Sequence, residues 1–380
     1  MKIAISTEVP GLQNNGILKR NVTKKYNNGA GCEWAFFLNE KIKHIHTVVS
    51  ADIALRNVKN KIWNAFEILV IQHMDDKDGR ELIDLGSIPF LILTLESPLY
   101  QGNFFDKSVN FINKFQNKLI YDGLMFDSQV YKENFSQIRY PSYSLDDIPK
   151  KNNSKIINKA VFVNTNQYIH HKTISKVRSI DDFMWLLRRV ISQIRFGVNH
   201  SKVLNLSKYH LHDKRLELVC EFLDNNFIDI YGKGWDNYDG LPKVWKKKLL
   251  HKLGKPIDRF FQKNKLECIK NYRFCLCVEN FEYPGYITEK IIQSLVAQSL
   301  PIYFGAPNIK DYIPSDCFIH AREFESSDLL IKFINNMDKN QYDKMILSGQ
   351  NYLKNPLGML HSNEIFAENI EILIQKEMKM

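Results

Sequence analysis

Residues Tyr272–Lys290 read YRFCLCVENFEYPGYITEK and outline a strand, a loop and the start of a helix. The segment Phe274–Val278 is apolar throughout, which is typical of a strand that is buried on both faces. The pair Pro284-Gly285 marks the loop, and Thr288 stands where the N-cap of a helix running to Gln298 is expected. Because backbone N–H groups are free at a helix N-terminus, this unit predicts a place where a phosphate binds.

The same alternation of apolar runs and helical patterns continues in both directions along the chain. Further strands are expected at Lys2–Ser6, Glu67–Gln72, Phe90–Leu95, Ala160–Val163, Phe227–Tyr231 and Pro301–Phe304. Further helices are expected at Cys32–Leu38, Ile53–Val58, His212–Asp224 and Glu364–Lys379. Doubly apolar strands that are separated by helices predict parallel sheets in an α/β fold.

A polar stretch, Asp146–Lys159, divides these elements into two sets and is interpreted as a linker. The sequence therefore predicts two Rossmann-like domains, residues 1–150 and 151–350, that face a cleft at the carboxyl ends of their strands. A C-terminal helix within residues 351–380 is expected to pack back on the first domain.

The composition is that of a globular protein with an excess of positive charge. The 380 residues are 44% hydrophobic and carry a net charge of +10, which suits a nucleotide diphosphate, a nucleic acid or a lipid surface as partner. The six cysteines form no CxxC pair, and we find neither a secretory signal nor an apolar run of bilayer length. We therefore expect reduced cysteines and a cytoplasmic chain. The basic run Lys243–Lys255 leaves peripheral contact with the inner face of the membrane open.

Three charged residues have the chemistry of a group-transfer site. Glu96 follows the strand Phe90–Leu95, where its carboxylate is suited to accept a proton as general base, or to cap the turn at Pro98. Arg215 offers a planar fork that matches a pyrophosphate, although a surface arginine on an amphipathic helix would look the same. Glu289, in the first turn after Thr288, suits the helix dipole and is able to accept hydrogen bonds from ribose hydroxyls.

The motifs around Tyr272–Lys290 resemble the signature of the family 10 α-1,3-fucosyltransferases. The matching residues are Tyr272-Arg273-Phe274, Glu279-Asn280, Tyr286-Ile287-Thr288-Glu289-Lys290, Pro301–Gly305 and Pro314–Phe324, with their spacing kept. The resemblance implies the GT-B arrangement of two Rossmann-like domains, with GDP-fucose as the donor substrate and a glycan as the acceptor.

The resemblance also implies roles for individual residues. Donor binding falls to Arg215, Tyr231, Gly232, Asn280, Tyr286, Thr288, Glu289 and Lys290. Lys290 would serve the phosphates, Glu289 the ribose or the reacting sugar, and Glu96 would be the catalytic base. Arg178 is the alternative to Arg215 as donor arginine.

The reaction implied is an inverting transfer of fucose without a metal, from β-linked GDP-fucose to an α-fucoside. A 1,3 linkage to N-acetylglucosamine in a bacterial surface polysaccharide, as in lipopolysaccharide biosynthesis or protein glycosylation, is the first expectation. The acceptor stays open, because the region after Pro98 matches the family poorly. Another GDP-6-deoxyhexose is the alternative donor.

Two other classes of protein remain as alternatives. Asp76-Lys-Asp78 follows a strand, as the metal-binding motif of a GT-A transferase would. The positive charge also permits a nucleic-acid-binding protein, but the basic residues do not interleave with aromatic residues in a recognisable motif. We therefore expect no nucleic-acid partner.

Overall fold

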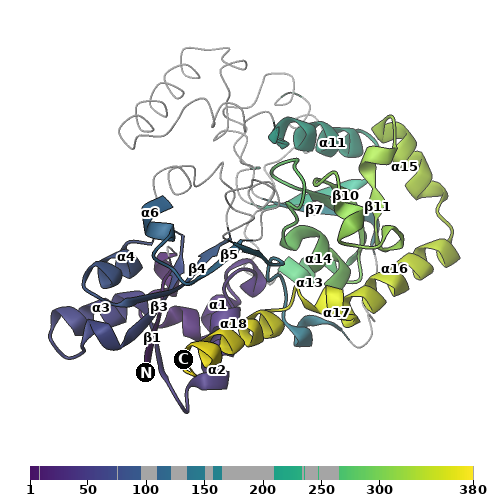
Figure 1. Ribbon diagram of the computed structural model, residues 1–380. Coiled ribbons are helices and arrows are strands. Elements are labelled where there is room, and N and C mark those ends of the chain that lie inside the picture. The colour runs from purple at the N-terminus through teal and green to yellow at the C-terminus, as the bar shows by residue number, and fades with distance from the viewer. Residues whose placement is uncertain are drawn as a thin grey trace, which may run out of the picture. The chain divides into compact units, whose positions relative to one another are not determined.

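The structure is a computed structural model that describes residues 1–7, 9–74, 76–95, 109–120, 135–149, 157–164, 209–232, 235, 247 and 265–379. The chain divides into two compact units. Unit 1 consists of Met1–Asp147 and Met359–Met380, and unit 2 consists of Ile148–Gly358. Each unit contains one parallel sheet covered by helices (Figure 1). The predicted α/β fold class is confirmed.

Unit 1 contains a six-stranded sheet in the order β2-β1-β3-β4-β5-β6, and every pairing is parallel. Its strands are β1 (Lys2–Ile5), β2 (Thr47–Ser50), β3 (Ile68–His73), β4 (Ile88–Thr94), β5 (Asn117–Ile120) and β6 (Ser136–Gln137). Successive residues of a strand point to opposite faces, so Ile3 and Ile5 join one hydrophobic cluster while Ala4 joins the other. Because both faces of the sheet are covered, the side chains on both faces of the central strands are apolar.

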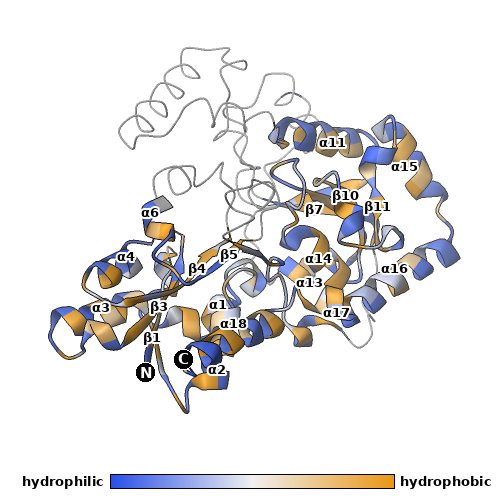
Figure 2. Ribbon diagram, viewed as in Figure 1, coloured by the Kyte–Doolittle hydropathy of each residue, from blue (hydrophilic) through white to orange (hydrophobic). Residues whose placement is uncertain are grey.

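Helices cover both faces of the unit 1 sheet. One hydrophobic cluster includes side chains from α2 (Trp34–Ile42) and α18 (Asn363–Glu377), which lie side by side in Figure 1. The cluster on the other face includes side chains from α3 (Ala51–Lys59), α4 (Lys77–Asp84) and α6 (Val109–Ile112). The short α1 (Arg20–Thr23) precedes α2. Figure 2 shows apolar stripes along α2 and α3, as expected for helices with one buried face.

Unit 2 contains a five-stranded parallel sheet in the order β11-β10-β9-β7-β8. Its strands are β7 (Ile157–Val163), β8 (Ile228–Tyr231), β9 (Tyr272–Val278), β10 (Leu300–Phe304) and β11 (Ile319–His320). Its helices are α11 (His212–Asp224), α13 (Lys265–Ile269), α14 (Glu289–Val296), α15 (Ser327–Asn336), α16 (Lys339–Lys354) and α17 (Pro356–Met359).

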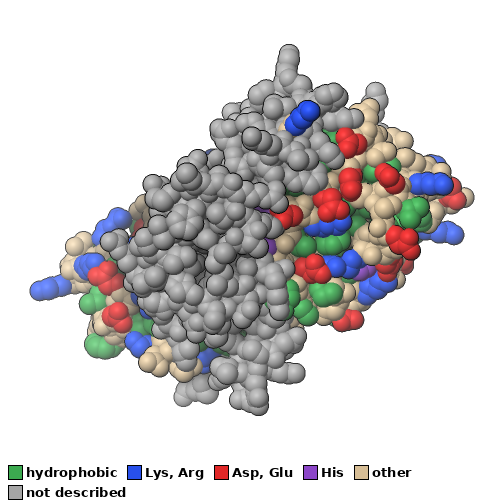
Figure 3. Space-filling model, turned by 90° about the horizontal axis from the view of Figure 1, so that it is seen from above, with side chains coloured by type: hydrophobic (Ala, Val, Ile, Leu, Met, Phe, Trp, Pro, Cys, Tyr) green, Lys and Arg blue, Asp and Glu red, His purple; other side chains and the backbone are tan. Residues whose placement is uncertain are grey.

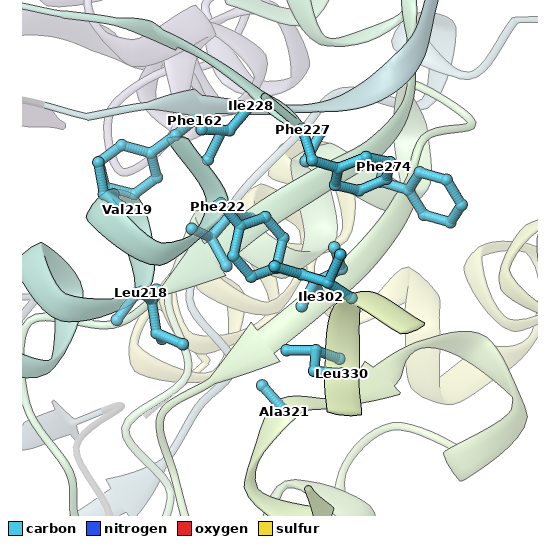
Figure 4. Packing of buried hydrophobic residues seen from close by; sticks show 14 of the residues in the cluster. Phe162, Leu218, Val219, Phe222, Phe227, Ile228, Phe274, Ile302, Ala321 and Leu330 are labelled. Carbon is cyan, nitrogen blue, oxygen red and sulfur yellow. The ribbon is translucent and has the colours of Figure 1, made fainter. Parts of the chain in front are cut away.

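The two faces of the unit 2 sheet are covered by different helices. On one face, α11 and α15 bury a cluster into which Phe162, Phe222 and Ile302 point (Figure 4). The opposite face carries Cys275 and Cys277, whose thiols are buried and free, as the sequence predicts. The Cys277 thiol lies 3.4 Å from the backbone oxygen of Lys290, so this face packs against α14.

Most predicted elements differ from the observed ones by one or more residues at their ends, and two of these differences have a clear physical cause. Residues 157–159 belong to β7 rather than to a linker, because Ile157 pairs with Tyr272 and donates its N–H to the Asn271 oxygen at 2.6 Å. The helix predicted to reach Gln298 ends at Val296, and Gln298 adopts a left-handed φ of 54°.

The surface carries charges of both signs. Figure 3 shows acidic and basic side chains interspersed over the described residues of the face that it presents. Among the described residues, no helix combines the length and apolarity that a bilayer span requires.

Candidate functional site

The candidate site is built where β9 and β10 end, because parallel strands deliver their carboxyl ends to one edge of a sheet. Glu279 and Asn280 follow β9 directly, and Gly305 follows β10. A Cβ atom at Gly305 would lie 2.5 Å from Cγ of Glu279. Glycine at this position therefore gives the Glu279 side chain its room.

Glu279 is fully buried and joins the end of β9 to the start of α14. Its Oε1 accepts the backbone N–H of Thr288 at 2.9 Å. Its Oε2 accepts the Thr288 hydroxyl at 2.8 Å and the Lys290 ammonium at 2.9 Å. Thr288 does occupy the N-cap position, but its side chain makes no capping hydrogen bond. The predicted N-cap position of Thr288 is confirmed, but its hydroxyl binds a buried carboxylate rather than a backbone N–H of the helix.

Lys290 is held as a cation within this network. Burial alone would lower the pKa of its ammonium, but the Glu279 and Glu289 carboxylates outweigh burial and raise it. The ammonium donates to Glu279 Oε2 and, at 2.9 Å, to the Thr288 hydroxyl. An ammonium has three N–H groups, so among the described residues these contacts leave one for a ligand oxygen.

Arg215 lies in the first turn of α11 and is only 2% exposed. Its Nη2 donates to the backbone oxygens of Val278 and Glu279 at 3.2 and 3.0 Å, and to Oδ1 of Asn280 at 2.6 Å. The guanidinium therefore fixes the end of β9 and orients the Asn280 amide. Its charge partly opposes the carboxylates, because it acts to lower the pKa of Lys290, which is raised on balance.

Glu289, the first residue of α14, faces a lysine that the sequence patterns did not single out. Its Oε1 lies 3.4 Å from Nζ of Lys265, on α13. Both side chains are mostly buried, with 12% of Glu289 and 16% of Lys265 exposed. The sequence QKNKLECIK around Lys265 carries three lysines and one glutamate in no recognisable motif, so no local pattern indicates the pair.

Arg322 is a second residue at this edge to which the sequence patterns gave no role. Its Nη2 donates to the Gly305 oxygen at 3.0 Å, and its Nη1 pairs with Glu282 at 2.7 Å. Its guanidinium also lies 4.4 Å from the centre of the Phe304 ring. The match of Pro314–Phe324 to the family pattern was the available signal for this residue.

Tyr286 lies in the loop before α14 and is 2% exposed. Its ring packs 4.9 Å from the ring of Tyr283 and 5.5 Å from that of Phe281. These aromatic contacts stabilise the loop that carries the chain from Asn280 to Thr288.

Tyr231 and Gly232 lie at the end of β8, but the Tyr231 hydroxyl is engaged elsewhere. It lies 2.9 Å from the hydroxyl of Tyr272, at the start of β9, which in turn donates to Asp229 at 2.8 Å. Gly232 has a φ of 128°, and a Cβ there would lie 2.1 Å from the oxygen of Asn164. Only glycine fits this turn.

Two predicted residues, Glu96 and Arg178, lie outside the described residues. The structure follows the chain before Glu96 as far as Leu95, which is buried directly after β4. In the predicted metal motif Asp76-Lys-Asp78, the first aspartate has a structural role. Asp76 is the N-cap of α4, and its Oδ1 accepts the N–H of Gly79 at 2.9 Å.

Comparison with known proteins gives one family for the region that contains the site. Residues 199–346 match the family model for the C-terminal part of glycosyltransferase family 10 (fucosyltransferase). The α-(1,3)-fucosyltransferase FucT of Helicobacter pylori is 36% identical over 111 residues, which make up 28% of this chain. That match spans only 22% of the length of FucT.

Solved structures resemble the chain over nearly its whole length. A crystal structure of an α1,3-fucosyltransferase aligns with a TM-score of 0.50 and 16% identity, covering 99% of this chain and 90% of that one. An α-glucosyltransferase in complex with UDP aligns with a TM-score of 0.55 and 11% identity, covering 98% and 100%. At such identities the likeness concerns the fold alone.

The chain has the GT-B fold of these structures, and residues 199–346 match the model of a glycosyltransferase family. Within residues 199–346 the chain is similar to glycosyltransferase family 10, the fucosyltransferases. The GT-A alternative is wrong, because both units contain parallel sheets of the GT-B kind and Asp76 caps a helix.

Proposed function

We propose that this chain transfers L-fucose from GDP-fucose to a hydroxyl group of a glycan. The observation that carries the proposal is the cluster of Arg215, Glu279, Asn280 and Lys290 at the carboxyl edge of the unit 2 sheet. It lies within the part of the chain that matches the fucosyltransferase family model. The donor would therefore bind to unit 2, within the second domain predicted from the sequence.

The diphosphate would bind at the start of α14. The first N–H groups of this helix point outward from its N-terminus, and Lys290 retains one N–H for a phosphate oxygen. The charge of Arg215 lies close by and is held by the carbonyl groups of β9. Asn280 and Glu289 would contact the nucleoside or the sugar, and Tyr286 would support them from the loop. These cations would neutralise the leaving diphosphate without a metal ion.

The chemical step would be a single displacement with inversion. The acceptor oxygen attacks the anomeric carbon as the bond from that carbon to the β-phosphate oxygen breaks. The acceptor proton passes to Glu96, and GDP leaves with the electron pair. Positive charge that develops on the sugar ring would be stabilised by Glu289. The β-linked donor would thus give an α-fucoside.

The resemblance supports a 1,3 linkage to N-acetylglucosamine, and the name of the relative from H. pylori gives the same 1,3 linkage. A bacterial surface glycan, built at the cytoplasmic side with peripheral membrane contact, is the setting that we propose for it. Lactosamine, an O-antigen repeat and a capsular sugar are the acceptors to compare.

The test is a panel of nucleotide sugars with and without lactosamine acceptors, followed by measuring the release of the nucleoside diphosphate. We expect release from GDP-fucose that increases with acceptor and persists in EDTA. Release from a different GDP-6-deoxyhexose alone would identify that sugar nucleotide as the donor in place of GDP-fucose. Release from UDP-sugars alone would overturn the proposal.

A further inference from the structure

We propose that Lys265 is a positioning residue of the donor site, which acts by holding the carboxylate of Glu289. This inference rests on the proposed function, because it concerns how the same site keeps its charges in order. Lys265 Nζ and Glu289 Oε1 are 3.4 Å apart, and at most about a sixth of either side chain is exposed. Water therefore screens this pair less than it screens a surface ion pair.

The two carboxylates of the site are matched to different lysines. Glu279 binds Lys290 at 2.9 Å, whereas Glu289 faces Lys265. Glu289 also lies close enough to raise the pKa of Lys290. Without Lys265, Glu289 would lose the ammonium that it faces while it still acts on Lys290. A carboxylate that turned to Lys290 would compete with the diphosphate for its remaining N–H.

The backbone of Lys265 is held in place by its helix, which limits the positions that its ammonium can reach. Leu266, Cys268 and Ile269 of α13 are buried and anchor this helix against its surroundings. The Lys265 charge also reaches Cys275, on the sheet face that α14 covers, and acts to lower the pKa of its thiol. Lys265 thus lies beside α14 as the helix begins, where it directs the Glu289 carboxylate.

The test compares Lys265→Met, which removes the charge and keeps the length, with Lys265→Arg, which keeps the charge. Lys270→Met is the matched control, because Lys270 follows the same helix and pairs with the exposed Glu267. We expect kcat/KM for the GDP-sugar to fall about 10-fold to 100-fold in Lys265→Met, since small misplacements at a reacting centre have effects of this size. Lys265→Arg should recover most of the loss, and Lys270→Met should match the wild type.

A double-mutant cycle with Glu289→Gln separates positioning from general structural support. If Lys265 acts through Glu289, the double variant will be no slower than Glu289→Gln alone. Additive losses, or a loss in Lys265→Met that Lys265→Arg does not recover, would overturn the inference. A wild-type protein that releases GDP from no GDP-sugar would instead overturn the proposed function, whereas full activity of Lys265→Met would refute only the role of Lys265.

Discussion

Among the described residues, each unit buries one glutamate completely, Glu33 in unit 1 and Glu279 in unit 2, and the two have different partners. The Glu33 carboxylate in unit 1 accepts hydrogen bonds from Nε of Arg20 and from the hydroxyl of Ser144, both at 2.7 Å. It also lies 3.1 Å from Nζ of Lys24. Among the described residues, the carboxylate of Glu279 in unit 2 accepts hydrogen bonds only from groups that follow it within 11 residues.

The difference in sequence separation gives the two carboxylates different tasks. Glu33 and Ser144 are 111 residues apart in the sequence. This carboxylate therefore joins the end of the segment Met1–Asp147 to a residue near its start. Glu279 instead fixes a turn between a strand and a helix and keeps Lys290 charged beside the helix N-terminus. A buried carboxylate thus stabilises tertiary structure in one unit and organises a candidate binding site in the other.

The largest effect that we expect is on catalysis, from a residue in the chain of unit 1. Glu96→Ala should lower kcat by about 100-fold to 10,000-fold, because the acceptor hydroxyl loses its general base. Binding of GDP, measured by calorimetry, should be unchanged if the donor is held by unit 2 alone. Weakened GDP binding in this variant would contradict that division of roles.

Glu33 should affect stability but not ligand binding. Glu33→Gln replaces a buried carboxylate that two cations share, and it should lower the free energy of unfolding by about 3 kcal/mol. Urea unfolding measures this loss, with Glu40→Gln as control, since the pair of Glu40 with Lys43 is exposed and should contribute less than about 1 kcal/mol. An equal loss of unfolding free energy in both variants would show that the burial of Glu33 does not strengthen its contribution to stability.

Lys290 should affect donor binding. Lys290→Met removes the ammonium that we assign to the diphosphate, and the dissociation constant of GDP should rise about 10-fold to 50-fold, the effect of losing one charged hydrogen bond. Arg215→Ala should weaken GDP binding as well. The control is Lys332→Met, on the exposed side of α15. Wild-type affinity in Lys290→Met would remove this residue from the donor site.

The smallest effect at neutral pH concerns His361, whose contribution to the stability of unit 1 changes only in acid. Burial lowers the pKa of His361 to about 3, so the imidazole stays neutral in the folded state. As the pH falls from about 6.5 towards 3, the unfolded chain takes up a proton that the folded state refuses, and stability decreases. His361→Phe should flatten this part of the pH dependence in thermal unfolding. A pH dependence identical to that of the wild type would exclude His361 as its source.

Much of the fold follows from local patterns. The helix His212–Asp224 was predicted to the residue, and β9 and β10 were found within two residues of their ends. Buried strands and amphipathic helices repeat their apolar residues at characteristic spacings, so short windows reveal them. The boundary at residues 157–159 was missed, because only pairing with β9 makes this polar start a strand.

The candidate site was predictable in part. The motif indicated Asn280, Glu289 and Lys290, and the structure brings them to one edge together with Arg215. It does not bring the hydroxyl of Tyr231 there, since Tyr272 engages it. Its central residue, Glu279, received no role of its own, because an acidic residue after a strand gives no sign that it will be buried.

The sequence by itself determined the two sets of α/β elements and the helix N-terminus that is suited to phosphate. Both depend on residues that are neighbours in the chain. Only the tertiary structure decided which charges are paired: Lys265 with Glu289, and Lys290 with Glu279. It also placed α18 against α2, although more than 300 residues separate them. Ion pairs and helix packing join residues that are distant in sequence, so no local pattern specifies them.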